Sequence, residues 1–299
     1  MELSSEEVDK LLFAGKVVRQ VLSKAAEIVK PGVRVIDVCE SLEKLIFELG
    51  AEPAFPCNVS INEVAAHYTS PADDQSVIPE DSLVKVDVGA HVDGYIADAA
   101  VTLCFNSEYI DLVEAAEEAL NAAISLIKPG VRIKSVSSAI ESTIRRFGFK
   151  PISNLTGHLM RRFMLHGGKS IPNVFGSYDD VILEGEVYAI EPFATTGAGH
   201  VEDTNQVYIY SFTKMKRAEN RFEKQLLKKI RLKFRSLPFS ERWLVNGWSI
   251  SQVRSALQSL SSKGALHAYP VLREAGGGLV AQAEHTVIVL RDGAEITTV

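Results

Sequence analysis

Asp87 and Asp98 lie in two neighbouring β-rich stretches, and valine or alanine stands on both sides of each aspartate. Such apolar bracketing is typical of a buried strand rather than of an exposed turn. If Leu83–Leu103 forms a hairpin that turns near Val92-Asp93, the two aspartates sit directly opposite each other, with Cβ atoms about 4.5–5.5 Å apart. Two facing carboxylates repel, and one would bind a proton unless a cation lay between them. The pair therefore predicts a site for a divalent metal ion.

Three more potential ligands occur in apolar or glycine-marked settings: His158 after Leu-Thr-Gly, Glu191 before a proline, and Glu284 before a histidine. Any one of them alone would more often be a core or surface group than a ligand. As a set, four carboxylates and one imidazole suit Mn, Fe(II), Co or Zn better than a soft metal. Because four negative charges must be neutralised, we expect two divalent ions.

An internal repeat indicates how these residues are positioned. Lys30–Gly50 aligns without gaps with Lys128–Gly148, and both segments open with Lys-Pro-Gly-Val-Arg. Further along, Val77–Asp87 resembles Val181–Glu191, and each segment ends on a carboxylate. One supersecondary unit used twice predicts two halves related by a pseudo-two-fold axis. Chance similarity of helix-stop signals is the alternative, and the matching order of two segments argues against it.

Helices and strands alternate in each half. Ser4-x-x-Glu7 reads as a capping box that opens a helix ending near Lys30, and a second, alanine-rich helix is expected over about Asp111 to Ile127. Beyond the hairpin, strands are expected over Val187–Ile190, Gln206–Tyr210 and Ala281–Leu290. The pattern favours an α+β fold in which helices cover one face of an antiparallel sheet.

Charge sets one segment apart. Residues 211–268 hold 13 Lys and Arg against 3 Glu and so carry +10, whereas the whole chain carries −6 and the remainder therefore −16. Helical patterns over 222–232, 240–245 and 249–260 predict an inserted subdomain. The basic face could simply be solvated, or it could bind an anionic partner such as ribosomal RNA.

Composition limits the compartment and excludes several classes of protein. The 299 residues include three widely spaced cysteines. We expect no signal peptide, and no apolar run is long enough to span a bilayer. Overall acidity excludes a wholly basic nucleic-acid binder. We therefore expect a cytoplasmic globular protein without a membrane anchor, and a monomer.

At the level of motifs the chain resembles the methionine aminopeptidases, specifically type 2 in its short archaeal form. The likeness covers nearly the whole chain, in order, in the following segments: 55–56 through 65–69, 86–89, 96–102, 154–158, 165–168, 189–193 and 281–286. It implies the pita-bread (creatinase-like) fold, a catalytic domain of residues 1–210 and 269–299, and a helical, winged-helix-like insertion over 211–268.

The resemblance also implies roles for individual residues. Five would be the ligands of the dinuclear metal site: Asp87, Asp98, His158, Glu191 and Glu284. Asp98 and Glu284 would bridge the ions, and hydroxide generated there would attack the scissile carbonyl. Glu191 would shuttle the proton, and His67 and His166 would contact the substrate. An apolar pocket for the methionine thioether would draw on Phe55, Leu165, Phe193 and Tyr269.

The implied activity is removal of the initiator methionine from nascent chains when the second residue is small, with transient ribosome contact through the basic insertion as an added possibility. Two alternatives stay open. One is an Xaa-Pro peptidase of the same fold, which would share the five ligands. The other is a non-catalytic relative that binds ribosomes or RNA, although such relatives have lost metal ligands and none is missing here.

Overall fold

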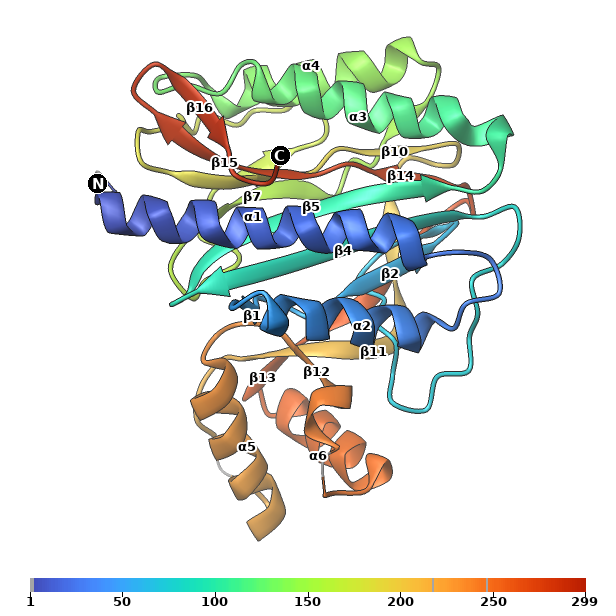
Figure 1. Cartoon of the computed structure of the whole chain (residues 1–299), viewed down its shortest axis with the longest axis vertical. Helices are drawn as coiled ribbons and strands as arrows, with labels where there is room; N and C mark the ends of the chain where they lie inside the picture. The colour runs from blue at the N-terminus through green and yellow to red at the C-terminus, as the bar shows by residue number, and fades with distance from the viewer. Residues whose placement is uncertain (1–2, 217, 246) are drawn as a thin grey trace.

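The computed structural model describes residues 3–216, 218–245 and 247–299. Four long helices lie on one side of the β-structure, and a smaller unit with two further helices projects at one end of the molecule (Figure 1). Within the described part of the chain no helix is long and apolar enough to cross a membrane. The α+β class and the one-sided helical cover are as expected from the sequence.

Helix α1 (Ser5–Ile28) begins with the predicted capping box. The backbone N–H of Glu7 donates to the Ser4 hydroxyl at 3.3 Å, and the Ser4 N–H donates to the Glu7 carboxylate at 2.9 Å. These two bonds satisfy N–H groups that the first turn of a helix leaves free. The helix packs along the sheet with one apolar face and is followed by α2 (Val35–Glu48).

The internal repeat is present in the structure. Helix α4 (Ile133–Arg146) occupies the place in the second half that α2 occupies in the first, and α3 (Ile110–Ile124) precedes it as α1 precedes α2. Helix α3 ends three residues before the predicted limit of Ile127. Each half has its own apolar core, one beneath α1 and α2 and the other beneath α3 and α4.

Matching hydrogen bonds tie the two aligned segments of each half together. Arg34 forms an antiparallel bridge with Val77, and Arg132 forms the same bridge with Val181. In addition, the Gly32 N–H donates to the backbone carbonyl of Ile78 at 2.8 Å. At the corresponding place in the second half, the Gly130 N–H donates to the backbone carbonyl of Ile182 at 2.9 Å. The sequence repeat therefore reflects one supersecondary unit built twice.

The predicted hairpin consists of β4 (Leu83–Val92) and β5 (Tyr95–Cys104), but its register differs from the prediction. The chain turns at Asp93-Gly94, one residue later than expected, with Gly94 at φ 86°. Asp87 consequently faces Ala100, and Asp98 faces Gly89. The expectation that the two aspartates sit directly opposite each other was wrong. They lie on the same face as diagonal neighbours, because the two-residue turn needs its glycine at the second position.

The expected strand over 281–290 is two strands, β14 (Val280–Gln282) and β15 (His285–Leu290). Glu284 lies at the break and forms an antiparallel bridge with Ala100 of β5. Their backbone bonds are 3.0 and 3.4 Å long. This bridge joins the C-terminal strands to the first half of the molecule.

All strand pairs with a stated register are antiparallel. In the second half, β9 (Val187–Ile190) has the predicted bounds and is flanked by β15 and β7 (Thr156–Met160). The remaining strands are β1 (Glu52–Pro53), β2 (Asn58–Ile61), β3 (Val64–Ala66), β6 (Lys150–Pro151), β8 (Ser170–Pro172), β10 (Phe193–Thr195), β11 (Val201–Phe212), β13 (Leu266–Glu274) and β16 (Gly293–Ile296).

The projecting unit at the lower end of Figure 1 contains the helices of the segment predicted to be an insertion, as far as the structure describes it. Two of the three predicted helices are α5 (Arg221–Phe234) and α6 (Ile250–Ser262). The third is a short 3₁₀ helix, η2 (Glu241–Leu244), preceded by the strand β12 (Phe239–Ser240). These elements share an apolar cluster and pack on the long pair β11 and β13, whose ends lead into and out of the unit.

Candidate metal centre

The five predicted ligands lie in or directly beside five strands: Asp87 in β4, Asp98 in β5, His158 in β7, Glu191 directly after β9 and Glu284 directly before β15. In one row across the sheet, Asp87 pairs with Ala100, and Ala100 pairs with Glu284. Glu191 continues this row, because Glu284 and Glu191 each stand one residue beyond the pair His285↔Ile190. The methyl group of Ala100 is the smallest side chain in the row and leaves room between the carboxylates on either side.

The neighbouring row, two residues along each strand, holds the other two predicted ligands. Asp98 pairs with Gly89 on one side and is hydrogen-bonded to Thr286 on the other. Thr286 in turn pairs with Ala189, and Ala189 pairs with His158. The Thr286 hydroxyl accepts from the Asp98 N–H and donates to the Asp98 carbonyl, both at 2.8 Å. Because side chains two residues apart point to the same face of a strand, the two rows bring all five predicted ligands together.

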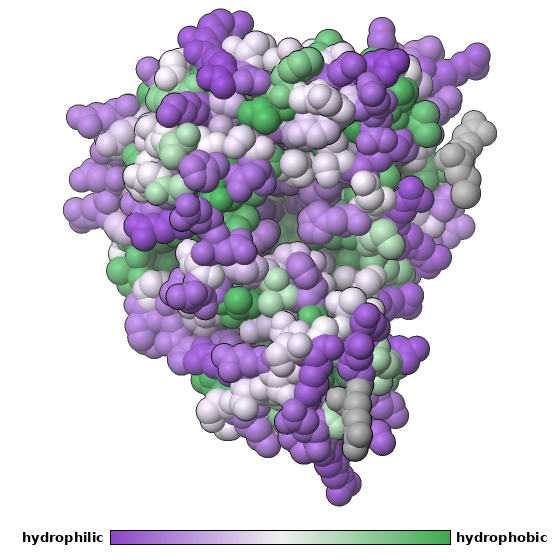
Figure 2. Space-filling model, turned by 180° about the vertical axis from the view of Figure 1, so that it is seen from behind, coloured by the Kyte–Doolittle hydropathy of each residue, from purple (hydrophilic) through white to green (hydrophobic). Residues whose placement is uncertain are grey.

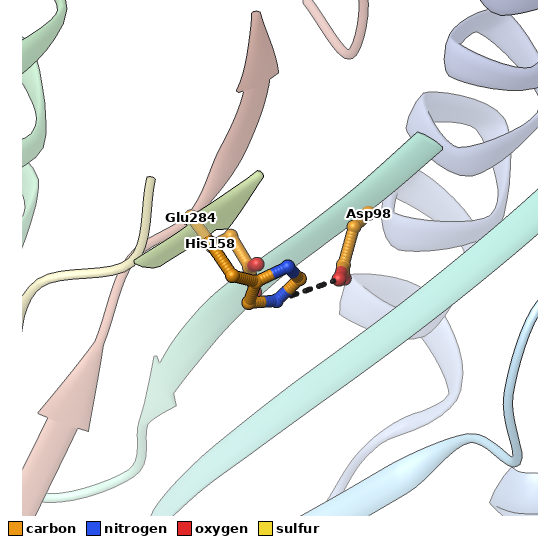
Figure 3. Close-up of side chains that lie close together, drawn as sticks. All are labelled: Asp98, His158 and Glu284. Carbon is orange, nitrogen blue, oxygen red and sulfur yellow. Dashed lines mark ion pairs between the residues drawn. The ribbon is translucent and has the colours of Figure 1, made fainter. Parts of the chain in front are cut away.

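Distances confirm that the cluster is tight. One ligand atom each of Asp98, His158 and Glu284 lies within 4.8 Å of the others, and these three side chains are grouped in Figure 3. His158 Nε2 is 3.7 Å from Asp98 Oδ2 and 3.5 Å from Glu191 Oε1. Glu284 accepts a hydrogen bond of 3.2 Å from the Gln282 side chain.

The electrostatics of the cluster are unfavourable for the protein by itself. Burial raises the pKa of Asp87 to about 7, and a hydrogen bond from the Gln282 side chain opposes this rise only in part. Burial, followed by repulsion from neighbouring carboxylates, also raises the pKa values of Asp98 and Glu284. Burial lowers the pKa of His158, so its imidazole is neutral. Four acids and a neutral imidazole in one buried space form an anionic site that a cation would stabilise.

Unpaired oxygens indicate where a cation fits. Asp87 Oδ1 and Asp98 Oδ1 are buried, and among the described residues no donor reaches either of them. Buried carboxylate oxygens without a partner are costly unless they coordinate a metal or bind a proton. The donor set, with oxygens in excess and one imidazole, is suited to a hard or borderline divalent ion.

The predicted substrate residues line the same cavity, which has a volume of 280 Å³. All eleven predicted site residues contribute to it: Phe55, His67, Asp87, Asp98, His158, Leu165, His166, Glu191, Phe193, Tyr269 and Glu284. From the side of the molecule away from the long helices, the surface is hollowed near its centre (Figure 2). The structure thus brings together every residue that the sequence indicated.

His67 has a defined tautomer. Its Nδ1 lies 3.1 Å from the carbonyl of Pro270, which can only accept, so Nδ1 carries the proton and Nε2 is left as an acceptor. Burial lowers the pKa of His67 to about 4, so the ring is neutral at physiological pH. Its backbone has φ 65°, a left-handed conformation that is uncommon for residues other than glycine and occurs often at functional sites.

His166 lies beside His158, with ring centroids 4.6 Å apart. The Tyr269 ring borders both histidines that are predicted to contact the substrate, with centroid distances of 5.6 Å to His67 and 6.3 Å to His166. These three rings all line the cavity.

Phe55 and Phe193 form apolar walls, and both are nearly fully buried. The Phe55 ring lies over Gly89, where a Cβ atom would come within 2.2 Å of it. Glycine is therefore required at position 89, directly opposite Asp98 in the same row, so that an aromatic ring can approach the strand.

Sequence reasoning missed several residues of the cavity and its supports. The additional lining residues are Asn58, Ala66, Asn154, Leu155, Thr156, Ile209, Pro238 and Leu272. Supporting hydrogen bonds come from Thr286, Gln282 and Thr102, whose hydroxyl donates to the Gln282 carbonyl at 2.6 Å. These three polar residues could have been found from the alternation of side chains along a strand. Each stands an even number of residues, two or four, from a predicted ligand and so points to the same face.

Comparison with known proteins identifies the family. Residues 9–289 match the metallopeptidase family M24. The chain is 48% identical over 296 residues to a methionine aminopeptidase of Pyrococcus horikoshii, and the match covers 98% of this chain and 99% of that protein.

Two solved structures share the fold. One is a methionine aminopeptidase from Thermotoga maritima, with a TM-score of 0.73, 26% identity, and coverage of 100% of this chain and 98% of that chain. The other is a thermophilic Arx1, with a TM-score of 0.88, 19% identity, and coverage of 99% and 91%. With a family match over most of its length and a relative at 48% identity, the chain belongs to metallopeptidase family M24 and, within it, to the methionine aminopeptidases.

Proposed function

We propose that this protein is a metalloaminopeptidase that removes the initiator methionine from nascent polypeptides when the second residue is small. The observation that carries the proposal is the single cavity that combines the buried acid cluster, two histidines and apolar walls. A relative called methionine aminopeptidase, 48% identical over nearly the full length, supports the same reading.

We further propose that Asp87, Asp98, His158, Glu191 and Glu284 hold two divalent ions, drawn from Co, Mn, Fe(II) or Zn. The unpaired oxygens of Asp87 and Asp98, and the mutual repulsion of the acids, support this assignment. When bound, such ions supply Lewis-acid chemistry, which lowers the pKa of water and polarises a carbonyl oxygen.

The protein's own residues would bind the peptide and move the proton. His67 Nε2, fixed as an acceptor by the bond to Pro270, would accept a hydrogen bond from the substrate. His166, beside His158, would stabilise the carbonyl oxygen as negative charge develops on it. Glu191, whose carboxylate faces the cluster, would carry the proton to the leaving amine.

The methionine side chain would lie among Phe55, Leu165, Phe193 and Tyr269. Sulfur makes favourable contacts with aromatic ring edges, and an unbranched thioether adapts to the shape of such a pocket. The cavity has a volume of 280 Å³ and two nearly fully buried aromatic walls, Phe55 and Phe193, so it can hold an apolar side chain of this size beside the acid cluster.

Hydrolysis of Met-Ala-Ser tests the activity. The purified protein is stripped with a chelator and assayed with and without Mn(II) or Co(II), and we expect metal to restore release of free methionine. Asp98→Asn should abolish that release, whereas H200A, at an exposed histidine, should not affect it. Turnover of an Xaa-Pro peptide in preference to Met-Ala-Ser would favour the proline-peptidase alternative. No turnover with either metal, from a folded protein, would contradict the proposal.

A second proposal concerns the basic unit of residues 211–268, which we consider a separate subdomain that contacts the ribosome transiently. Helix α5 carries a row of exposed basic side chains that includes Lys224, Lys228 and Arg231. Among the described residues, no acidic group lies within ion-pair distance of these three. The lower end of the molecule in Figure 2, where this unit lies, is largely hydrophilic. An unpaired basic helix face attracts a polyanion.

Charge reversal at Lys224, Lys228, Lys229 and Lys233 should weaken co-sedimentation with ribosomes at low salt. Reversal of four exposed lysines outside the unit, Lys16, Lys24, Lys30 and Lys44, is the matched control, since it changes net charge equally. Equal loss of binding in both variants would indicate an effect of net charge alone, and unchanged binding in the first would contradict the proposal.

A further inference from the structure

The loop between β7 and β8 carries Leu165 and His166, and its tip is held from outside. Arg161 and Met164 close a tight turn through backbone bonds of 2.8 and 2.9 Å. Phe163, at the tip, has φ 57° and donates its N–H to the carbonyl of Gly94 at 2.8 Å. The tip therefore rests on the turn of the β4–β5 hairpin.

The Phe163 ring is bordered by three cationic or aromatic groups. His91 lies edge-on at 5.6 Å, and the guanidinium carbons of Arg162 and Arg235 lie 5.7 and 3.9 Å from the ring centroid. Arg235 belongs to the inserted unit, directly after α5, and the next residue, Ser236, donates its hydroxyl to the Phe163 carbonyl. The inserted unit thus contacts both the ring and the backbone of the tip.

Arg235 makes this contact in a strained conformation. Its φ of 55° and ψ of −115° fall in a region that only glycine adopts without steric cost. A strained residue persists where surrounding interactions hold it, and such residues concentrate at functional sites. Here the interaction is a guanidinium stacked closely on an aromatic ring.

We propose that Arg235 is a positioning residue, which holds the Phe163 tip and thereby keeps Leu165 and His166 in place at the cavity. Two and three residues separate these side chains from Phe163, so movement of the tip moves them. Met164 and His166 are themselves exposed, and the loop packs against the apolar cluster around Phe55 through the partly buried side chains of Phe163 and Leu165. The kinetic part of this inference rests on the proposed peptidase function.

Two substitutions separate the stack from the strain. R235A removes the stacked cation and keeps the strained backbone, whereas R235G removes the cation and relieves the strain. Both should raise KM for Met-Ala-Ser by about three- to tenfold with kcat nearly unchanged, because substrate binds only the fraction of molecules in which the loop is in place. Their melting temperatures should differ, with R235G the more stable. R235K, which keeps the charge, should recover part of the loss.

D81G is the matched control, because Asp81 also has a positive φ of 53° and lies away from the loop. It should change the melting temperature without changing KM. If KM rose in proportion to the loss of melting temperature in all three variants, R235A, R235G and D81G, the role of Arg235 would be merely structural and the inference would be overturned. So would an unchanged KM in both Arg235 variants.

Hydrogen exchange tests the placement without reference to activity. Amides of residues 159–168 should exchange about tenfold faster in both Arg235 variants than in wild type, and at the wild-type rate in D81G. Unchanged exchange in that segment would overturn the inference even if the enzyme is active. Conversely, if the wild-type protein had no activity on methionyl peptides but exchange was still faster in both Arg235 variants, the positioning role would stand and only the proposed function would be contradicted.

Discussion

Single side chains in this site act through their position in a strand. Ala100 illustrates the principle, because its small side chain stands between Asp87 and Glu284 in one row across the sheet. A larger residue there would fill the space between the two carboxylates. Gly89 serves the neighbouring row in the same way, by letting Phe55 approach the backbone.

His67 provides a test of substrate contact as distinct from metal binding. Because its ring is neutral and hydrogen-bonded to Pro270 rather than placed in the acid cluster, H67A should lower kcat/KM by about 10²–10³-fold. The affinity of the H67A variant for Mn(II), measured by calorimetric titration, should stay within about threefold of the wild-type affinity. A large loss of Mn(II) affinity would place His67 among the ligands instead.

Glu274 provides a test of stability against pH. Burial favours its neutral form, but N–H groups from Gly278, Gly199 and Gly276 outweigh burial and lower its pKa below 4.5. A pKa lowered by folding contributes stability above the unfolded value, and this contribution is lost as pH falls through the folded value. E274Q should therefore cost about 2 kcal/mol at pH 7 and progressively less below pH 4.5.

Urea denaturation between pH 3 and pH 7 measures that difference. E295Q, at an exposed position on β16, serves as the control and should show no comparable pH dependence. A cost of E274Q that is the same at pH 3 and pH 7 would contradict the assignment of the stabilisation to the ionised carboxylate.

At the scale of elements, the repeat, the capped first helix and the β4–β5 hairpin follow from local patterns. The hairpin register did not, because an error of one residue at the turn shifts every cross-strand pair. The break between β14 and β15 was also missed, since the apolar pattern continues through it while Glu284 pairs with a strand far away in the sequence. Such pairings depend on tertiary contacts.

A buried ion pair between elements connects the inserted unit to the first half. Glu43 of α2 accepts from both terminal nitrogens of Arg242, at 2.9 and 3.3 Å, and from the Trp243 indole at 2.8 Å. It also accepts from the N–H of Cys57, which adjoins the cavity residue Asn58. Loss of one partner would leave a buried charge uncompensated.

E43A should therefore lower the free energy of unfolding by about 3–5 kcal/mol, as measured by urea denaturation. K44A is its neighbour on the same helix and breaks an exposed pair with Glu48, so it should cost less than about 0.5 kcal/mol. The double variant E43A/R242M should recover stability relative to E43A. If E43A and K44A lowered the free energy of unfolding equally, burial would not strengthen the Glu43–Arg242 ion pair.

At the scale of the whole molecule, the acid cluster lies where the two halves meet. Asp87 and Asp98 come from the first half, whereas His158 and Glu191 come from the second and Glu284 from the C-terminal strands. A cation held by all of them would connect the halves, so binding should stabilise the entire fold rather than one loop.

Metal binding should consequently raise the melting temperature of the chelator-treated protein. With free Mn(II) at 100 times its dissociation constant, linkage predicts about 2.7 kcal/mol, or several degrees for a chain of this size. D98N, which is nearly isosteric, should fold but lose most of this shift. An equal rise in D98N would indicate metal binding elsewhere on the protein.

The sequence by itself determined the family, most of the elements and eleven of the residues that line the cavity, because each of the eleven stands in a short motif that can be recognised without the fold. Only the tertiary structure decided how these residues meet: the rows across five strands, the diagonal relation of Asp87 and Asp98, and the supports from Thr286 and Gln282. The contact of Arg235 with Phe163 belongs to the same group. Cross-strand register and contacts between distant segments depend on where whole elements pack, and no local pattern specifies that.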